Sequence, residues 1–481
     1  MGSQISTRQL GFINVVLEQF LHLKEVFMTQ RFSRRNFLAA STQTGLAAML
    51  VGAAPTVLVA ADASVDGKPA LLGGTAMNKT SYSHWPILHG DEEKFILEVL
   101  KSGQWFRGST HLSKVAQFEN EYATMCGAKA CIATSSGTSA LVASLAALDI
   151  GPGDEVVTSP YTFIATINSI IAHYALPVPI DVDLDSFQLD GKLADTACNE
   201  NTRCLMPVHI GGAPANMDDF LAVGKKRGVP VIEDACQAHI GQWRGKKLGA
   251  VGDAGCFSFQ VSKNLSSGEG GAVLTNDEEL AEKVYRCHNN CRGRRTDSFD
   301  FTYGVGRAVN QRMTEFQGAV LCAQIKYIEQ YQETRNENGL YLNKLLAEIP
   351  GVFPAKIYEG GESAWHLYMF RIDAEKFGIN RDLFLKALSA ERIPCSSGYG
   401  AVNWIEFVRS AYNTLAGKRI YPKSVLDQWA ERVGQLPQFK KLCSQAVWFT
   451  QNLLLGPRSN MDIIADAIRR IQKNAADIAK M

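Results

Sequence analysis

The sequence has almost no net charge. Its 49 Lys and Arg residues balance 48 Asp and Glu residues, so the formal net charge is +1. Without a basic surplus there is no reason to propose nucleic acid or an acidic membrane surface as a partner. The chain also lacks internal repeats and low-complexity tracts. With 481 residues, 46% hydrophobic and 20% charged, it has the composition of an ordinary globular protein and is long enough for two domains.

The cysteines lack the spacing of a disulfide framework. There are eleven, an odd number, and they are scattered along the chain, so we expect reduced and mostly buried thiols. Cys287, His288 and Cys291 stand close together, but no second Cys or His pair follows at the spacing of a zinc site. We therefore predict no metal site.

Long hydrophobic runs are absent except for one, at residues 37–60, which is long enough to span a bilayer. It follows the twin-arginine pair of SRRNFLAAS (33–41) and ends in a small-residue cleavage pattern, ADA (61–63). Residues 1–63 thus resemble a twin-arginine export signal, and that pathway carries folded proteins. We expect the mature protein to be soluble and periplasmic or otherwise exported.

The N-terminal segment has other interpretations. An uncleaved signal could anchor the protein to the membrane, although Pro55 and the many Ala and Gly residues disfavour a stable anchor. The segment could also be an inactive leader on a cytoplasmic protein. The stretch MTQRFSRRNF suggests Met28 as an alternative start to Met1.

Strand and helix signals alternate along residues 131–275, which predicts a largely parallel sheet covered by helices. A long amphipathic stretch, 314–346, then leads into a smaller C-terminal domain. There, residues 370–394 are predicted to form a strand, a turn and a helix, and residues 461–479 a closing helix. We place three divisions: an N-terminal extension (1–63), a large domain (64–330) and a small domain (331–481).

One lysine stands in an unusual context. Lys263 lies in FSFQVSKNLSSGEGGAVLTND (257–277), between a short apolar strand and the glycines Gly268, Gly270 and Gly271. A lysine amine reacts with an aldehyde only if it is partly desolvated or lies near another cation. These neighbours could supply such a site, so Lys263 is a candidate Schiff-base nucleophile. The alternative is a solvated surface charge.

A carboxylate stands where it suits the same chemistry. In GVPVIEDACQAHI (228–240), residues 229–232 are predicted to form a buried parallel strand, and Asp234 follows its C-terminal end. Open α/β sheets bind ligands at that edge. A carboxylate there keeps the ring nitrogen of pyridoxal phosphate protonated. The alternative is that Asp234 caps a following helix.

A third segment suits an anion. CIATSSGTSALVASLAALDI (131–150) is predicted to form a strand, a hydroxyl-rich turn and a helix, so that the turn, Ser135 to Ser139, points N–H groups at a phosphate. Such turns also cap helices without any ligand. The Walker pattern is missing, so no nucleotide triphosphate site is indicated.

In this order the three segments resemble the fold-type-I pyridoxal phosphate aminotransferases, and among them the sugar aminotransferase family often called DegT/StrS. The resemblance runs from about residue 69 to 471. It implies an α/β fold with a mostly parallel seven-stranded sheet between helices, and a smaller C-terminal α+β domain. The motifs that carry it are PALLGG (69–74), LKSGQWFRG (100–108), IGPGDEVVTSPYTFIATINSI (150–170), PVPIDVDLDSFQLD (177–190), EDACQAH (233–239), GDAGCFSFQVSKNL (252–265) and NQRMTEFQGAV (310–320).

The resemblance implies a role for each residue of the lysine site. Lys263 would bind pyridoxal phosphate as a Schiff base and move the proton between cofactor and substrate carbon. Asp234 would pair with the pyridine nitrogen, and Gln237 would hydrogen-bond the ring oxygen. Phe163 in TFIAT would stack on the ring, with simple core packing as the alternative.

Further residues are implied at the phosphate. Gly137, Thr138 and Ser139, with Ser258, resemble the phosphate cup. Asn310 matches a residue that reaches the phosphate from the neighbouring subunit, which implies a homodimer with shared active sites. The stretch GRAVNQRMTE (306–315) departs here from the family's usual Gly-Tyr-Asn-Tyr-Arg.

The lysine also bears on the reaction, because a related dehydratase group has histidine at its position. Lys263 therefore implies transamination from glutamate or glutamine to a keto-sugar, free or nucleotide-linked, or to a keto-cyclitol. Residues 392–404 and 443–471 resemble the cyclitol and aminohydroxybenzoate branch. Tyr399 and Trp448 are candidates for substrate contact or, equally, for packing. The rival functions are a non-catalytic protein that holds the cofactor, and a sugar dehydratase.

Overall fold

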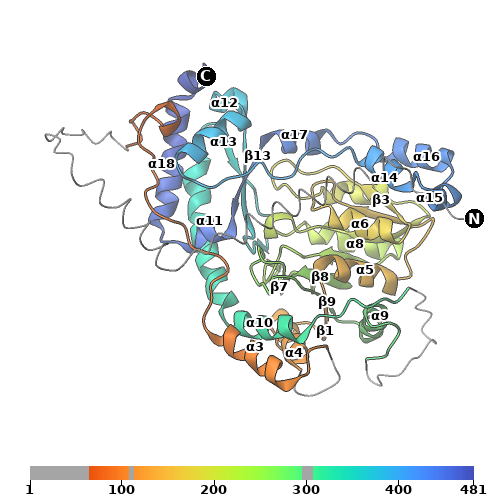
Figure 1. Ribbon diagram of the computed structural model, residues 1–481. Coiled ribbons are helices and arrows are strands. Elements are labelled where there is room, and N and C mark those ends of the chain that lie inside the picture. The colour runs from red at the N-terminus through yellow and green to blue at the C-terminus, as the bar shows by residue number, and fades with distance from the viewer. Residues whose placement is uncertain (1–63, 108–112, 295–306) are drawn as a thin grey trace, which may run out of the picture. The chain divides into compact units, whose positions relative to one another are not determined.

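The computed structural model describes residues 64–107, 113–294 and 307–481 (Figure 1). The described residues belong to one compact unit. The predicted export signal and the alternative start at Met28 lie outside the described residues. Within the described ranges, no helix is both long enough and apolar enough to cross a bilayer.

A four-stranded sheet and a three-stranded sheet lie edge to edge and together form the centre of the large part. Two parallel bridges, Leu205 to Val231 and Val208 to Asp234, join them. One strand runs antiparallel to both of its neighbours and the other adjacent pairs are parallel, which confirms the expected sheet. In spatial order the strands are β1 (Ala130–Thr134), β9 (Gly271–Thr275, the antiparallel one), β8 (Ala254–Ser258), β5 (Ile232–Asp234), β4 (Thr202–Met206), β2 (Glu155–Thr158) and β3 (Leu176–Pro179).

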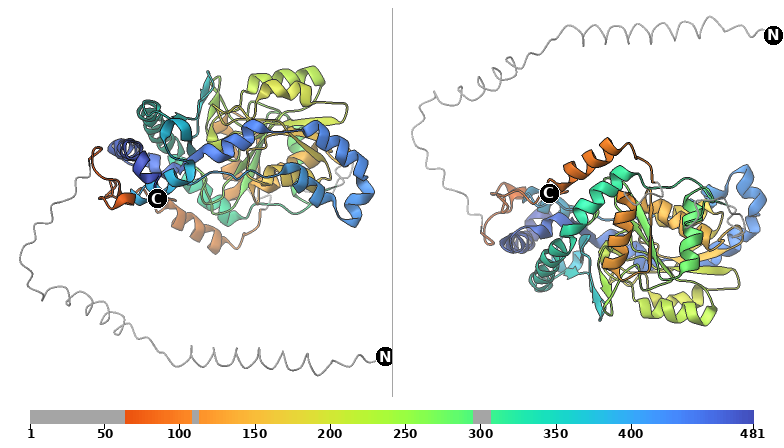
Figure 2. Two further views of the ribbon diagram at one scale, coloured as in Figure 1. Left: turned by 90° about the horizontal axis from the view of Figure 1, so that it is seen from above. Right: turned by 90° about the horizontal axis from the view of Figure 1, so that it is seen from below.

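Alternate residues of the strands enter two different cores, as the pleat of a strand requires. Ile132 of β1 belongs to a core with helices α5 (Gly137–Ala147) and α9 (Glu278–His288). Cys131 and Ala133 belong to the core on the opposite face. That second core includes residues of α4 (Lys114–Cys126), α8 (Met217–Arg227) and α10 (Glu315–Gln324). Helix α3 (Asp91–Ser102) packs beside α10 (Figure 2).

The strand predicted at 229–232 is displaced towards the C-terminus. It forms as β5, Ile232–Asp234, so Asp234 is its last residue. Pro230 has no N–H for a ladder, and the N–H of Val231 donates to Asp253 Oδ2 instead, 2.8 Å away. Turns follow Asp234, not a helix, so the interpretation of Asp234 as a helix cap is wrong. Gln237 accordingly lies in a turn.

The C-terminal part has its own antiparallel sheet and core. Helix α11 (Ile328–Ala347) leads into it, and β10 (Val352–Pro354), β12 (Leu367–Ile372) and β13 (Ala446–Thr450) form the sheet. Helices α13 (Arg381–Ala390) and α18 (Ser459–Lys473) cover this sheet. Strand β12 and helix α13 confirm the strand and helix predicted within 370–394, and α18 confirms the predicted closing helix.

Two segments of the chain pack against the part of the molecule to which they were not assigned from the sequence. The N-terminal residues Leu71 and Leu72 pack against the C-terminal core, and the buried carboxylate of Glu391 accepts from Ala70 N, 3.0 Å away, and pairs with Arg470. In the other direction, helices of the C-terminal half pack on the large part: α14 (Trp404–Tyr412), α15 (Leu415–Ile420) and α16 (Lys423–Val433). A division at residue 330 stays a prediction.

Helices α14 to α16 cover strand β3, which lies at the end of the strand order (Figure 1). The hydroxyl of Tyr412 donates to Ala175 O over 2.7 Å, and Trp429 Nε1 donates to Pro177 O over 2.9 Å. The N–H groups of Leu176 and Ile180 face inward, onto β2, so residues 175, 177 and 179 face outward. Two of these outward residues are prolines, which have no N–H.

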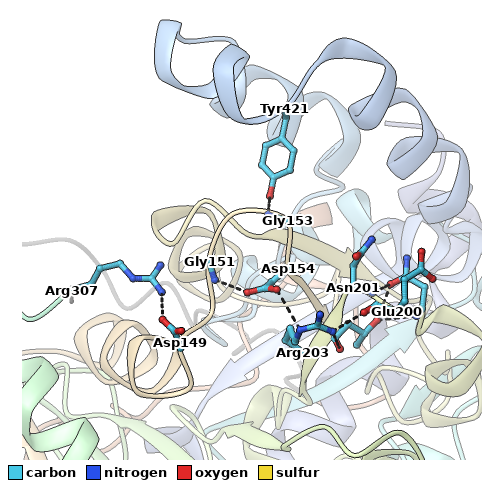
Figure 3. Close-up of polar contacts among 11 residues, drawn as sticks. Asp149, Gly151, Gly153, Asp154, Glu200, Asn201, Arg203, Arg307 and Tyr421 are labelled. Atoms are coloured by element: carbon cyan, nitrogen blue, oxygen red, sulfur yellow. Dashed lines mark hydrogen bonds and ion pairs between the residues drawn. The ribbon is translucent and has the colours of Figure 1, made fainter. Parts of the chain in front are cut away.

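Tyr421 lies between α15 and α16, and its hydroxyl binds the turn before β2. It accepts from Gly153 N over 2.8 Å and donates to Tyr174 O over 2.6 Å. Figure 3 shows the same turn closed by Asp154, whose carboxylate accepts from Gly151 N over 2.8 Å and pairs with Arg203. The helical cover is thus fixed to both β3 and the turn beside it.

Candidate active site

Four of the predicted site segments meet at one edge of the sheet. The turn after β1, the end of β5 at Asp234, the end of β8 at Ser258 and the loop that carries Lys263 all follow the carboxyl ends of mutually parallel strands. This is the edge where open α/β sheets bind ligands. The topology therefore brings together residues that are far apart in the sequence.

Lys263 is a nearly buried amine without a partner. Its Nζ makes no hydrogen bond or ion pair with any residue that the structure describes. Burial lowers the pKa of Lys263, while Cys236 and Asp234 act in the opposite direction. The indole N–H of Trp85 donates to Lys263 O, 3.2 Å away, and so holds the loop from outside. A lysine in this state carries a larger neutral, nucleophilic fraction than a solvated one.

Asp234 is 5% exposed and is held by two donors. Thr166 Oγ1 donates to Asp234 Oδ2 over 2.7 Å, and Cys236 N donates to Oδ1 over 3.3 Å. Thr166 lies in the first turn of α6 (Ala165–Ala172), and its Oγ1 is 2.7 Å from that of Thr162. The sequence analysis missed Thr166, because a threonine at a helix start usually serves as a cap.

The turn after β1 forms a cluster of hydroxyls at the start of α5. Ser136 caps the helix by accepting from Ser139 N over 3.0 Å, and Ser139 Oγ lies 2.9 Å from the hydroxyls of both Ser135 and Ser136. Thr138 is exposed at the same end. A Cβ at Gly137 would lie only 2.7 Å from Ser258 Cβ, so the glycine lets the helix end approach β8. The helix N-terminus favours an anion at this place.

Gln237 is held from two sides. Its Oε1 accepts from Gly211 N over 2.7 Å, and its Nε2 donates to the hydroxyl of Tyr399 over 3.0 Å. Tyr399 comes from the C-terminal part, on the loop between α13 and α14. The structure thus places one of the two candidate substrate residues beside a candidate cofactor residue.

The aromatic candidates differ in exposure. Phe163 is 57% exposed, so the interpretation of it as a core residue is wrong. Its ring centroid lies 6.5 Å from that of Tyr399. Trp448 is 8% exposed and packs edge-on against Tyr399, with 4.7 Å between ring centroids, and against the buried Tyr161. Trp448 thus packs within this aromatic cluster, and its contact with a substrate stays a prediction, while Phe163 presents its ring to the surroundings.

Asn310 makes no hydrogen bond to these described residues itself, although the adjacent Gln311 O accepts from Ser135 N over 2.7 Å. Asn310 is exposed, pairs through its backbone with Asn289, and accepts from Arg312 N through its side chain over 3.4 Å. Within the described parts of this chain, no contact joins Asn310 to the hydroxyl cluster or to Lys263.

A buried histidine supports the end of β8 and was not predicted. His239 Nε2 lies 2.8 Å from Ser258 O, which can only accept, so Nε2 carries the proton. Nδ1 therefore accepts from the hydroxyl of Tyr122, 2.9 Å away. Burial lowers the pKa of His239 to about 3. The neutral ring holds the backbone of Ser258 in place beside Gly137.

The cysteine and histidine group at 287–291 forms no metal site that the structure describes, since no three metal-ligating side chains come together within the described ranges. His288 Nδ1 donates to Tyr285 O over 2.6 Å, and the ring is buried. Seven of the eleven cysteines are buried and the other four are partly exposed.

Pyridoxal phosphate fits the chemistry of these residues. An unpartnered, nearly buried amine at Lys263 suits an aldehyde, and the anchored carboxylate of Asp234 suits a protonated ring nitrogen. The hydroxyls and N–H groups at the start of α5, with Ser258, suit a phosphate. The residues that would hold the cofactor are therefore Lys263, Asp234, Gln237, Ser258 and the turn at 135–139.

This strand order, with a lysine in this loop, is the fold of structurally similar pyridoxal phosphate-dependent enzymes of fold type I, and the family match identifies the chain as an aminotransferase of that fold. The sequence pattern described as the DegT/DnrJ/EryC1/StrS aminotransferase family matches residues 86–448, and the chain belongs to this family. This confirms the family and the cofactor that the sequence analysis predicted.

Three similarities illustrate the membership. The chain is 36% identical to spore coat polysaccharide biosynthesis protein SpsC of Bacillus subtilis (strain 168) over 312 residues, 64% of this chain and 79% of SpsC. It is 30% identical to L-glutamine:2-deoxy-scyllo-inosose aminotransferase of Streptoalloteichus tenebrarius over 429 residues, 85% of this chain and 98% of that enzyme. The crystal structure of 3-amino-5-hydroxybenzoic acid synthase superposes with a TM-score of 0.69 at 29% identity, covering 83% of this chain and 99% of that one.

Proposed function

We propose that this aminotransferase moves an amino group from glutamine or glutamate to the ketone carbon of a keto-cyclitol or keto-sugar. The similarity to a glutamine-dependent inosose aminotransferase supports this substrate class and favours glutamine as the donor. The observation that carries the reaction type is the unpartnered, nearly buried amine of Lys263 beside the anchored carboxylate of Asp234.

Each residue has a task in this reaction. When bound, pyridoxal phosphate supplies an electron sink for the carbanion at the substrate carbon. The neutral amine of Lys263 would accept a proton at Nζ from the substrate carbon and donate it to the cofactor. Asp234, whose carboxylate accepts a hydrogen bond from Thr166, would pair with the ring nitrogen of the cofactor. The start of α5 and Ser258 bind the phosphate and so fix the orientation of the whole group.

The visible spectrum of the purified protein tests this proposal. We expect an absorbance band of the bound cofactor that bleaches when glutamine or glutamate is added, and that is absent in Lys263→Ala. The exposed Lys225 on α8 provides a control, because Lys225→Ala should keep band and bleaching. Bleaching that a keto-cyclitol or keto-sugar reverses identifies the acceptor class. A band that no amino donor bleaches would instead support a non-catalytic cofactor-holding protein.

We further propose a homodimer in which Asn310 reaches the phosphate of its partner's site. The exposure of Asn310, and the exposure of the large apolar residues Leu88 and Phe106, support it. Coexpressed Lys263→Ala and Asn310→Ala chains should recover up to about a quarter of the activity, because half of the dimers are mixed and each has one intact site. A monomer in analytical ultracentrifugation would refute the proposal.

We also propose that residues 1–63 direct export through a twin-arginine pathway. The pair Arg34-Arg35 and the apolar run after it support this. Replacing both arginines by lysine should keep the protein in the cytoplasm, as measured by fractionation and immunoblotting. If the wild type and the double Lys variant have the same distribution between cytoplasm and exported fraction, export by this route is refuted. Recovery of wild-type protein in the membrane fraction would show an uncleaved anchor.

A further inference from the structure

The amide of Gln237 has an assigned orientation. Gly211 N can only donate, so the atom 2.7 Å from it must be the oxygen of the Gln237 amide. The NH2 group therefore faces the other way and donates one hydrogen to the hydroxyl of Tyr399, over 3.0 Å. Its second hydrogen has no acceptor among the described residues and is free for a ligand oxygen.

The partner on the oxygen side is rigid. Gly211 has φ +67°, and a Cβ there would lie 2.5 Å from Met369 Cε, so this turn is built for glycine. The preceding Ile210 N donates to Gln188 Oε1 over 3.1 Å. The oxygen of Gln237 is thus anchored to the large part of the protein.

The partner on the nitrogen side, Tyr399, is held by both the large part and the C-terminal part. The loop of Tyr399 is held at Ser396, whose N–H donates to Trp448 O over 3.0 Å, and near its other end by Trp404 Nε1, which donates to Pro160 O over 3.0 Å. The ring of Tyr399 also packs edge-on against Trp448 and Tyr161, with centroid distances of 4.7 and 5.7 Å. These contacts hold the ring independently of its hydroxyl.

We infer that Tyr399 is a positioning residue: its hydroxyl fixes the amide of Gln237 so that the free N–H points at the ring oxygen of the bound cofactor. This inference rests on the proposed function. Without the hydroxyl, only the contact with Gly211 restrains the amide, and the N–H is no longer confined to one direction.

The test is a pH titration of the visible band in the holoenzyme. A donor on the ring oxygen stabilises its anionic form and keeps the titration midpoint low. Tyr399→Phe should therefore raise the midpoint by about half to one pH unit, the effect of one hydrogen bond. It should also lower kcat more than it raises KM. The control is Tyr161→Phe, which removes a hydroxyl from the same aromatic cluster that makes no hydrogen bond to Gln237, and it should leave the midpoint unchanged.

A double-mutant cycle decides whether Tyr399 acts through Gln237. Gln237→Leu should raise the midpoint, and adding Tyr399→Phe to it should cause no further change. An unchanged midpoint in Tyr399→Phe, or an equal shift with and without Gln237, would overturn the inference. These outcomes differ from failure of the proposed function, in which the wild-type protein itself shows no band that responds to an amino donor.

Discussion

The hydroxyl of Thr166 donates to the carboxylate of Asp234 across 2.7 Å, from the start of a helix to the end of a central strand. Asp234 is almost completely buried, so this bond and the one from Cys236 N fix which way the carboxylate faces. A carboxylate that cannot rotate keeps its charge in one place before any ligand arrives.

Loss of the threonine hydroxyl should slow the reaction with the amino donor. We expect Thr166→Val to lower the rate of that half-reaction about tenfold, because a hydrogen bond to a charged group contributes at least ~1.4 kcal/mol. Stopped-flow absorbance of the bleaching band measures it. Thr166→Ser keeps the hydroxyl and should react nearly as fast as wild type; equal rates in the Val and Ser variants would contradict the role of the bond.

A methyl group at Gly137 should weaken cofactor binding. Its Cβ would lie 2.7 Å from Ser258 Cβ and 2.9 Å from Cys236 Sγ, too close for nonbonded atoms, so the start of α5 must move away from β8. We expect Gly137→Ala to raise the Kd for pyridoxal phosphate about tenfold or more, by fluorescence titration of the apoprotein. Gly400→Ala is the control, since no atom lies within 4 Å of a Cβ there; similar Kd values in both would refute the argument.

The buried His239 should make the fold sensitive to acid. Its pKa is lowered to about 3 by burial, below the ordinary 6.5, so between these values the unfolded chain binds the extra proton. Stability therefore falls as the pH drops below about 6.5, by up to ~1.4 kcal/mol per pH unit from this residue. Urea denaturation between pH 7 and pH 4 measures the slope.

Two variants isolate the contribution of this histidine. His239→Gln should have a smaller slope of unfolding free energy against pH than wild type, whatever its stability at pH 7. His84→Gln, at an exposed position, should keep the wild-type slope. Parallel curves for wild type and His239→Gln would show that His239 does not contribute.

Local sequence was sufficient for some features of the site and not for others. Lys263, Asp234 and the hydroxyl turn each stand at a junction of strand and loop, and the alternation of strands and helices brings such junctions to one edge. The contacts that orient them join residues 68 positions apart, for Thr166 and Asp234, and 162 apart, for Gln237 and Tyr399. No local pattern records such pairs.

The fold shows the same limit. The start of β5 was misplaced because Val229 and Val231 look like strand residues, whereas the missing N–H of Pro230 and the side chain of Asp253 decide where the ladder begins. Helices α14 to α16 carry buried residues such as Val408 and Tyr412 at ordinary helical spacing. That spacing predicts a buried face but not which surface covers it.

The helical cover of β3 should contribute to stability through its hydrogen bonds. Trp429→Phe removes the donor to Pro177 O and leaves a buried carbonyl unpaired, so we expect a loss of about 1–3 kcal/mol in unfolding free energy by urea denaturation. Tyr174→Phe, which changes an exposed ring on the same edge, should change it little. Equal stability of Trp429→Phe and wild type would mean that the carbonyl finds another donor.

The cover of β3 also bears on how the molecule behaves among copies of itself. An open outer strand is a template on which another chain can add a strand and begin aggregation. Here the outward positions of β3 are prolines or have their carbonyls bound by Tyr412 and Trp429. At the opposite end of the sheet, the N–H of Ala133 in β1 donates to Glu119 over 2.7 Å. The outward edge of β3 therefore offers few free N–H groups to an added strand, and Glu119 already occupies one of those on β1.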